Sequence, residues 1–260
     1  MNSRYDVMRH YLIIDGKSTK DFGVYLSGDG TFKAPEKNVE EFTIPGRNGS
    51  FHYSASNSYK NLMVPYDCFI FKDFKRNVAD FRSFLLSRNG YVRIEDTHHP
   101  DEFRMGIYHE EFDPEVFVDL SAAEFTLNFD CKPERWLKSG EEVLEFTGAS
   151  SVLENATYFE AKPLITLYGE PNTSCAFNIK TYGPQGIDTE IRFTMPSTGY
   201  ITIDTEIDEV YAEGDSYNNI IHFDPEDNVC LYFPTIKPGT NDVRLWNLTK
   251  AEIIPRWWIL

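Results

Sequence analysis

The histidines are the residues whose types and spacing come nearest to a metal site. His98 and His99 are adjacent, His109 follows, and acidic residues lie between positions 96 and 102. Imidazole and carboxylate groups are ligands that zinc takes together. Neighbouring residues of an extended chain, however, point to opposite sides, so His98 and His99 are poorly placed to bind one ion. We therefore interpret residues 96–102 as a polar loop between strands.

Other signatures of chemistry are absent or incomplete. Residues 224–228 read Asp-Pro-Glu-Asp-Asn, which lacks the regular spacing of a calcium loop, so we expect a hairpin turn. The chain has no G-x-S-x-G or S-x-x-K motif, and Gly23, Gly28 and Gly30 have the wrong spacing for a phosphate-binding loop. With 41 acidic residues, no carboxylate pair stands out as a glycosidase site. We therefore expect no enzyme, and no catalytic, cofactor-binding or metal-ligating residue.

The composition limits the partners of the protein. The 260-residue chain has a formal net charge of -16 at pH 7, which argues against wrapping nucleic acid or docking on an anionic membrane. No stretch reaches the roughly 18 consecutive apolar residues of a membrane helix. Residues 1–15 have no apolar h-region, so we expect no secretory signal. The length suffices for one large domain or two small ones.

The four cysteines show no redox or metal-binding pattern. Cys68, Cys131, Cys175 and Cys230 are far apart and form no CxxC motif. The first three lie in strand-like runs, so we interpret them as small buried hydrophobic residues. Synthesis in a reducing compartment is the natural inference.

Strand patterns dominate the first half of the chain. Between 125 and 131, apolar residues alternate with polar ones, as in a strand with one buried and one solvated face. Residues 64–71 form a more apolar run, which predicts a strand covered on both faces. Further strands are expected at 91–94 and 104–112, after a turn at Asn89-Gly90.

One segment has helical periodicity instead. Apolar residues at 74, 78, 81 and 85 fall on one face of a helix, and Asn89-Gly90 supplies a stop signal. The pattern predicts a single amphipathic helix near 72–88 that lies on a sheet and closes its core.

The segment 132–140 marks a predicted domain boundary. It reads Lys-Pro-Glu-Arg-Trp-Leu-Lys-Ser-Gly and follows a regular strand pattern. Beyond it, short apolar runs near 164–168, 176–179, 190–193 and 200–203 are separated by turns rich in glycine and proline. Short strands at this spacing predict a β-sandwich.

The chain ends on Pro-Arg-Trp-Trp-Ile-Leu, residues 255–260, which is unusually apolar for a terminus. Large aromatic side chains lose most by staying in water, so the end is either packed in the fold or buried against a partner. We expect a final strand within the second domain. Trp257 and Trp258 should then face opposite sides, with one in the core and the other covered by the first domain or a partner.

Several segments, in the expected order, resemble the distal tail protein (Dit) family of long non-contractile-tailed bacteriophages, with phages and prophages of Gram-positive hosts most similar. Each motif alone is weak, but their combination is fairly specific and covers nearly the whole chain. The segments are Ser18–Gly28, Phe42–Gly49, Asp130–Leu137, Pro163–Gly169, Lys237–Asn241 and Pro255–Leu260.

The resemblance implies a mainly β fold, with an N-terminal β domain carrying one amphipathic helix (residues 1–135) and a C-terminal galectin-like β-sandwich (residues 136–260). It implies a homohexameric ring of N-terminal domains at the virion tail tip, with DNA passing through the lumen and no specific nucleic-acid binding. The ring would join the tail-tube protein to the tail-associated protein. The C-terminal domains would project as arms that hold receptor-binding proteins. Synthesis would take place in the cytoplasm of the bacterial host.

The resemblance also suggests contact residues. Arg47, flanked by turn residues, is a candidate contact between subunits of the ring, with a simple chain reversal as the alternative. Arg135 and Trp136 are candidates for an interdomain elbow, with core packing as the equal alternative. Trp257 and Trp258 are the remaining candidate contacts.

A carbohydrate-binding module that attaches the virion to the host cell wall is the alternative function. Sugar sites stack a saccharide ring on an exposed tryptophan or tyrosine. The candidates are Tyr182, Tyr200, Tyr217 and Trp246, each of which could equally belong to a core. Some Dit relatives carry inserted carbohydrate-binding modules, and this chain is too short to hold one.

Overall fold

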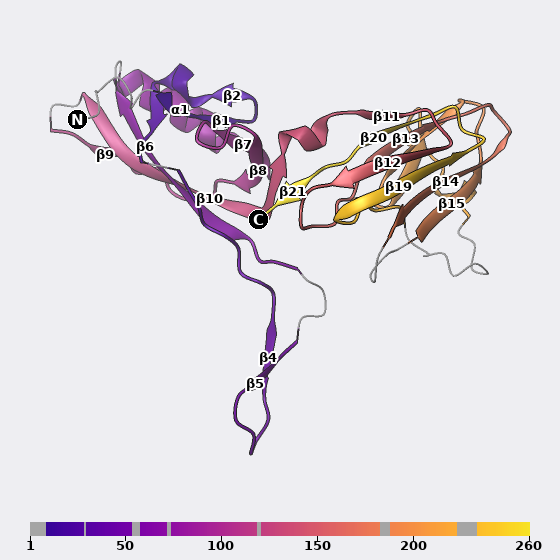
Figure 1. Ribbon diagram of the computed structural model, residues 1–260. Helices are drawn as coiled ribbons and strands as arrows, with labels where there is room; N and C mark the ends of the chain where they lie inside the picture. The colour runs from indigo at the N-terminus through magenta and orange to yellow at the C-terminus, as the bar shows by residue number, and fades with distance from the viewer. Residues whose placement is uncertain are drawn as a thin grey trace. The chain divides into compact units, whose positions relative to one another are not determined.

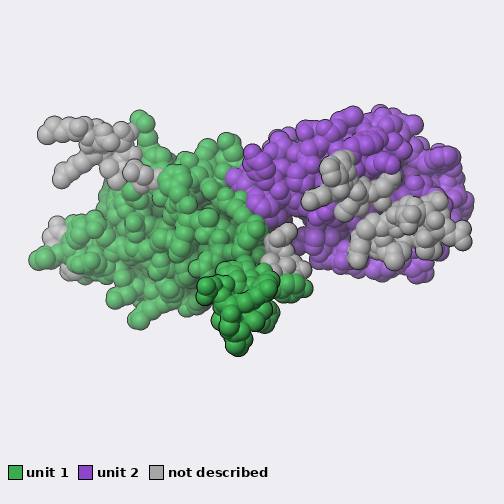
Figure 2. Space-filling model, turned by 60° about the horizontal axis from the view of Figure 1, so that its bottom comes forward, with its two compact units in different colours: residues 1–135, 260 green, residues 136–259 purple. Residues whose placement is uncertain are grey.

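The computed structural model describes residues 9–28, 30–53, 58–71, 74–118, 121–182, 188–222 and 233–260. The chain forms two compact units, unit 1 (residues 1–135 and 260) and unit 2 (residues 136–259), which Figure 2 shows in different colours. The described part is mainly β, as predicted, and contains a single α-helix. None of its helices has the length and hydropathy needed to cross a bilayer. The turn expected at 224–228 and Cys230 lie outside the described residues.

Unit 1 is built on one large sheet (Figure 1). A short 3-10 helix at Thr19–Phe22 precedes its edge strand β3 (Val24–Leu26), and β9 (Glu115–Val116) also pairs with β10 (Ala122–Leu137). The strand order is β2 (Lys17–Ser18), β1 (Leu12–Ile14), β7 (Val92–Asp96), β8 (Glu102–Ile107), β10 (Ala122–Leu137), β6 (Leu62–Phe71) and β3 (Val24–Leu26).

The helix α1 (Phe74–Leu86) covers the core face of this sheet, and the helix predicted near 72–88 is confirmed. Its buried side chains Phe81, Phe84 and Leu85 pack with the inward-facing residues of β6 and β10. Along β10 the buried positions alternate from Ala123 to Cys131, as the sequence pattern predicts. Burial of a continuous apolar face on both partners fixes the helix on the sheet.

The strand β6 differs from its prediction. Its buried and accessible residues alternate, so the expectation of a strand covered on both faces is wrong. The extra apolar residues have another use: Phe69 and Phe71 lie on the outer face, half-buried, beside Tyr25 of β3. Their ring centroids are 5.7 and 5.6 Å from that of Tyr25. Aromatic side chains on adjacent strands thus shield one another without a covering layer.

Unit 2 is a sandwich of two antiparallel sheets around one core. The strands expected at 164–168, 176–179, 190–193 and 200–203 are β13, β14, β15 and β16. The larger sheet has the order β11 (Leu144–Phe146), β20 (Lys250–Ile254), β13 (Leu164–Tyr168), β16 (Tyr200–Asp204), β17 (Glu209–Ala212) and β18 (Asp215–Ser216). The smaller sheet has the order β12 (Ser150–Asn155), β19 (Gly239–Trp246), β14 (Ser174–Thr181) and β15 (Asp188–Thr194).

The predicted boundary segment is mostly strand. The strand β10 continues to Leu137, and a 3-10 helix follows at Lys138–Glu141. The last strand, β21 (Trp258–Ile259), pairs with β10, and the Leu137 amide donates to the Trp257 carbonyl at 2.9 Å. The expectation that the final strand completes a sandwich sheet is therefore wrong. Arg256, with a φ of 57°, redirects the chain between β20 and β21.

Cys68, Cys131 and Cys175 are buried free thiols on β6, β10 and β14. Their interpretation as small hydrophobic residues is confirmed. Burial raises the pKa of each thiol, so the reactive thiolate is disfavoured.

Candidate functional site

Several exposed apolar side chains of unit 1 lie together on the hairpin of β4 (Glu40–Thr43) and β5 (Ser50–Tyr53). Figure 1 shows this hairpin projecting from the rest of unit 1. Phe42 pairs with Phe51, and Glu40 pairs with Tyr53. Because side chains alternate across a strand, Phe42, Phe51 and Tyr53 share one face of the hairpin, with Glu40 at its edge opposite Tyr53. Their exposures are 52%, 56% and 58%.

The opposite face of the hairpin is polar. It carries Glu41 and Thr43 from β4 and Ser50 and His52 from β5. The hairpin is therefore amphipathic, yet its apolar face is open to solvent in the single chain. An isolated two-stranded hairpin is at best marginally stable in water, and contiguous exposed apolar side chains are typical of interaction surfaces.

Arg47 lies in the tight connection of this hairpin. Gly46 and Gly49 on either side of it have φ values of 82° and 83°, which only glycine adopts without strain. The Arg47 amide donates to the Ile44 carbonyl at 3.1 Å, and its exposed guanidinium lies 5.9 Å from the Phe51 ring. The two glycines thus allow the chain to reverse, and the Arg47 guanidinium lies exposed at the tip of the hairpin. Its contact with another subunit stays a prediction.

Arg135 and Trp136 lie near the end of β10. Arg135 forms an ion pair with Glu102 of β8, and its side chain is only 14% exposed. Trp136 is half-buried and belongs to unit 2. The elbow role of these two residues stays a prediction.

The two C-terminal tryptophans have partners within unit 2. Trp257 packs, half-buried, against the sandwich core. Trp258 stacks on Phe159 with ring centroids 4.2 Å apart, and its indole Nε1 donates to the Glu160 carbonyl at 2.9 Å. Gly140 lies against the Trp257 backbone, where a side chain would collide with the Trp257 amide. These contacts tie the chain end to unit 2.

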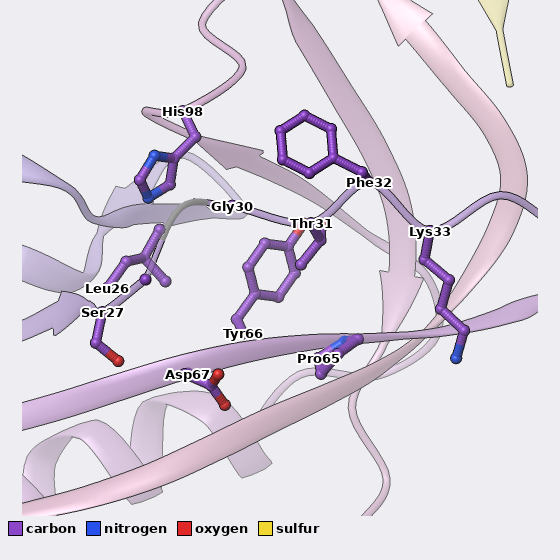
Figure 3. A pocket seen from close by; sticks show the side chains of 11 residues that line it. Leu26, Ser27, Gly30, Thr31, Phe32, Lys33, Pro65, Tyr66, Asp67 and His98 are labelled. Carbon is purple, nitrogen blue, oxygen red and sulfur yellow. The ribbon is translucent and has the colours of Figure 1, made fainter.

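A small cavity in unit 1, of about 230 Å³, includes one residue of the predicted polar loop. Figure 3 shows His98 across this cavity from Pro65 and Asp67 of β6. The His98 ring stacks on that of His10 with centroids 3.9 Å apart. The outer edge is formed by the exposed Phe32.

The carboxylate of Asp96 explains the conformation of that loop. Its Oδ1 accepts hydrogen bonds from the backbone amides of His98 and His99, both at 2.9 Å, and lies 3.0 Å from Nδ1 of His99. The acid thus stabilises the turn between β7 and β8, as predicted for a polar loop. Among the described residues, no three potential ligands converge on a metal position.

The four aromatic candidates for sugar binding differ in their exposure to solvent. Tyr217 packs against the core of unit 2, and Tyr200 is half-buried beside Tyr168. Tyr182 and Trp246 are exposed. Trp246 borders an open groove on the smaller sheet of the sandwich.

Sequence reasoning found the tip of the hairpin and missed its apolar face. The signal was present, because apolar residues at 42 and 44 and at 51 and 53 flank the turn at alternate positions. That pattern predicts an amphipathic hairpin, but it cannot say whether the apolar face is covered.

No protein-family model and no curated protein matches the sequence. Solved structures match the fold along almost the whole chain. The crystal structure of the Dit protein of phage SPP1, described as a paradigm of the hub adsorption apparatus in phages infecting Gram-positive bacteria, aligns with a TM-score of 0.70 at 17% identity. The alignment covers 94% of this chain and 97% of that one.

A chain of the phage P2 baseplate, in its activated conformation with calcium, aligns with a TM-score of 0.50 at 16% identity. It covers 95% of this chain and 97% of that one. The two neighbours are a phage hub protein and a chain of a phage baseplate, and each alignment includes residues of both units. The protein therefore has a Dit-like fold, and the resemblance to the distal tail protein family that the sequence suggests is confirmed at the level of the fold.

Proposed function

We propose that this protein is a structural component of a long non-contractile phage tail tip, where it acts as a hub. Unit 1 would form a hexameric ring that joins the tail-tube protein to the tail-associated protein. Unit 2, which we expect to be galectin-like, would serve as an arm that holds receptor-binding proteins. The Dit-like fold, shared with a hub protein and a baseplate chain, supports this role. The role is mechanical and involves no catalytic step.

The uncovered face of the β4–β5 hairpin carries the proposal. Phe42, Phe51 and Tyr53 are each more than half exposed, although full burial of such a side chain is worth about 1.5–3 kcal/mol. A second copy of this chain is the occupant we propose, because a ring brings every hairpin to a neighbour by the same rotation.

The charge at the hairpin tip fits this arrangement. The chain has 41 acidic and 25 basic side chains, so the surface of a neighbouring copy is predominantly acidic. Arg47 would present a cation to that surface at the end of the apolar contact. Complementary charge of this kind fixes register and excludes wrong partners more than it adds affinity.

The same net charge suits a ring that surrounds DNA. A formal charge of -16 per chain repels the phosphate backbone and disfavours specific or non-specific binding. DNA would then pass through the lumen without adhering. We expect no retention of double-stranded DNA by the ring at physiological salt.

Mass photometry of the full chain, alone and with the tail-tube protein of the same phage, tests the proposal. The expected species has six times the 30.1 kDa mass of one chain and becomes more abundant when the tube protein is added. Monomers alone, persisting at micromolar concentration with the tube protein present, would contradict the ring. Negative-stain images of the assembled species would distinguish a closed ring from an open oligomer.

A further inference from the structure

An open groove lies on the outward face of the smaller sheet of unit 2. Its volume is about 530 Å³, which is within the range of about 300–1,000 Å³ typical of small-molecule sites. All of the residues that line it belong to unit 2. It is lined by Ala149, Ala176, Asn178, Glu190, Arg244, Leu245, Trp246 and Asn247.

The strand register places the lining side chains in two neighbouring rows. Trp246 of β19 pairs with Ala176 of β14, and Arg244 pairs with Asn178. Asn178 pairs in turn with Glu190 of β15. Residues two apart on a strand share a face, so all five side chains lie on the outward face of the sheet. Asn178 is only 7% exposed there, and its Nδ2 donates to the Thr189 carbonyl at 3.3 Å. One row therefore holds Trp246, Ala176 and Arg192, and the next holds Arg244, Asn178 and Glu190.

Trp246 is the aromatic side of this groove. It is 72% exposed, and its neighbour on β14 is the small Ala176. A large side chain next to so small a neighbour has space beside it for a ligand. An indole ring in this position offers an apolar face on which another ring can stack.

The polar side of the groove is balanced in charge and held in place. The Arg244 guanidinium lies 3.4 Å from the Asp242 carboxylate and 3.2 Å from the Tyr182 hydroxyl, which itself donates to Asp242 at 2.7 Å. The Arg192 Nε donates to the Glu190 carboxylate at 2.6 Å. Two cations are thus matched by two anions. Such a surface attracts neither anionic nor cationic polymers strongly, but it offers fixed donors and acceptors.

These features together select the class of ligand. A pyranose ring has an apolar C–H face and a rim of hydroxyls that both donate and accept, which matches an indole beside guanidinium, carboxylate and carboxamide groups. A protein partner fits less well, because the centre of a protein interface is depleted in charged residues. We propose that the groove binds an uncharged saccharide, with one sugar ring stacked on Trp246 and its hydroxyls bonded to Arg244, Glu190 and Asn178.

The test uses the full chain on an array of neutral and anionic glycans. Titration of the best neutral glycan then follows, monitored by isothermal calorimetry. We expect saturable binding of neutral glycans, and a loss of about tenfold or more in affinity for Trp246→Ala. Glu190→Gln and Arg244→Lys should each weaken binding less. Tyr158→Ala is the matched control, because Tyr158 is a 91% exposed aromatic residue of unit 2 that does not line the groove.

Several results would overturn the proposal. These are an array without any neutral ligand, a preference for anionic glycans, or equal affinity of Trp246→Ala and the native protein. Loss of a tail-protein contact in Trp246→Ala, without any glycan binding, would make the face a protein interface instead. The melting temperature of Trp246→Ala should stay unchanged, which excludes unfolding as the cause. Ring assembly of this variant should also be unchanged, so the saccharide site and the hub role can fail separately.

Discussion

Arg256 and Asp204 form a two-pronged ion pair within unit 2. The guanidinium Nη1 and Nη2 atoms lie 2.6 and 3.0 Å from the Oδ1 and Oδ2 atoms of the carboxylate. Arg256 also has a φ of 57°, a conformation that costs a non-glycine residue about 1–3 kcal/mol. The ion pair thus holds a backbone turn that is unfavourable by itself, and this turn directs both C-terminal tryptophans to their contacts.

Replacing Arg256 with alanine should destabilise unit 2. Hydrogen bonds to charged groups contribute about 1.5–3 kcal/mol, so we expect a loss of this size in the free energy of unfolding. All four tryptophans of the chain, at 136, 246, 257 and 258, lie in unit 2, so urea unfolding followed by tryptophan fluorescence reports on that unit. Lys162→Ala, which removes an exposed ion pair with Glu206 in unit 2, is the control and should change little. Equal midpoints for the two variants would contradict the role of the pair.

The stability of unit 2 should depend on the charge of Asp204. The hydrogen bond from Arg256 lowers the pKa of this carboxyl below its ordinary value of 3.8. A lowered folded-state pKa means that the contribution is complete above the unfolded pKa and is lost as the pH falls through the folded pKa. The stability difference between the native protein and Asp204→Asn should therefore be constant near neutral pH and shrink below about pH 4. A difference that grows on acidification would show that another group dominates.

Gly140→Ala should displace the C-terminal segment. A side chain at this position would collide with the backbone amide of Trp257. The Arg256 amide also donates to the Gly140 carbonyl at 2.8 Å, so movement of either segment breaks that bond. We expect a loss of about 1–3 kcal/mol, as for other overpacked sites, measured by tryptophan fluorescence during unfolding.

Gly148→Ala is the matched control for this substitution, because a Cβ there would lie no closer than 3.6 Å to its neighbours. It should leave the unfolding midpoint nearly unchanged. Similar losses of stability in both variants would mean that the replacement of a glycine as such lowers the stability. The contact with Trp257 would then not be the cause.

Polar substitutions on the apolar face of the hairpin should weaken assembly and spare the fold. In the double variant Phe42→Ser, Phe51→Ser, we expect ring assembly at least about tenfold weaker, because each phenylalanine contributes about 1.5–3 kcal/mol when buried. Mass photometry with the tail-tube protein measures the change. The control is Thr43→Ala, Ser50→Ala, a directly opposed pair on the polar face. Normal assembly of the phenylalanine variant would place the interface elsewhere.

The buried cysteines should resist thiol reagents while the protein is folded. Burial raises the pKa of Cys131 to about 12, and the pKa values of Cys68 and Cys175 are also raised by burial. In a Cys230→Ser background, reaction with a chromogenic disulfide at pH 8 should therefore be slow until denaturant is added. Rapid reaction of one thiol without denaturant would reveal local opening of its strand.

Local patterns were sufficient to predict most of the secondary structure. The helix expected at 72–88 is α1, Phe74–Leu86, because four apolar residues on one face leave no comparable alternative. The alternation from Phe125 to Cys131 likewise located β10 and its buried face. In both segments the spacing of the apolar residues indicates which face of the helix or strand is buried.

The errors arose where a side chain's partner is distant in sequence. Phe69 and Phe71 indicated a buried strand, but Tyr25 covers them on an accessible face. The end of the chain indicated a sandwich strand, but the turn at Arg256 and the ion pair with Asp204 send it to β10. Periodicity reports how apolar a face is, and not which segment lies against it.

The groove at Trp246 shows the same limit for the candidate sites. Four aromatic residues were equally eligible in the sequence, and only strand register and exposure distinguish the outward Trp246 from the packed Tyr217. The arginines and carboxylates beside it come from two separate strands, β15 and β19, which no local motif connects.

The amphipathic hairpin also has a kinetic consequence. A two-stranded ribbon gains little by forming alone, so part of its ordering cost would be met only when a neighbouring chain covers Phe42, Phe51 and Tyr53. Oligomerisation would then act as the final folding step of each subunit. A chain made in excess over its neighbours would keep an adhesive surface exposed, and its solubility would depend on how quickly the ring closes.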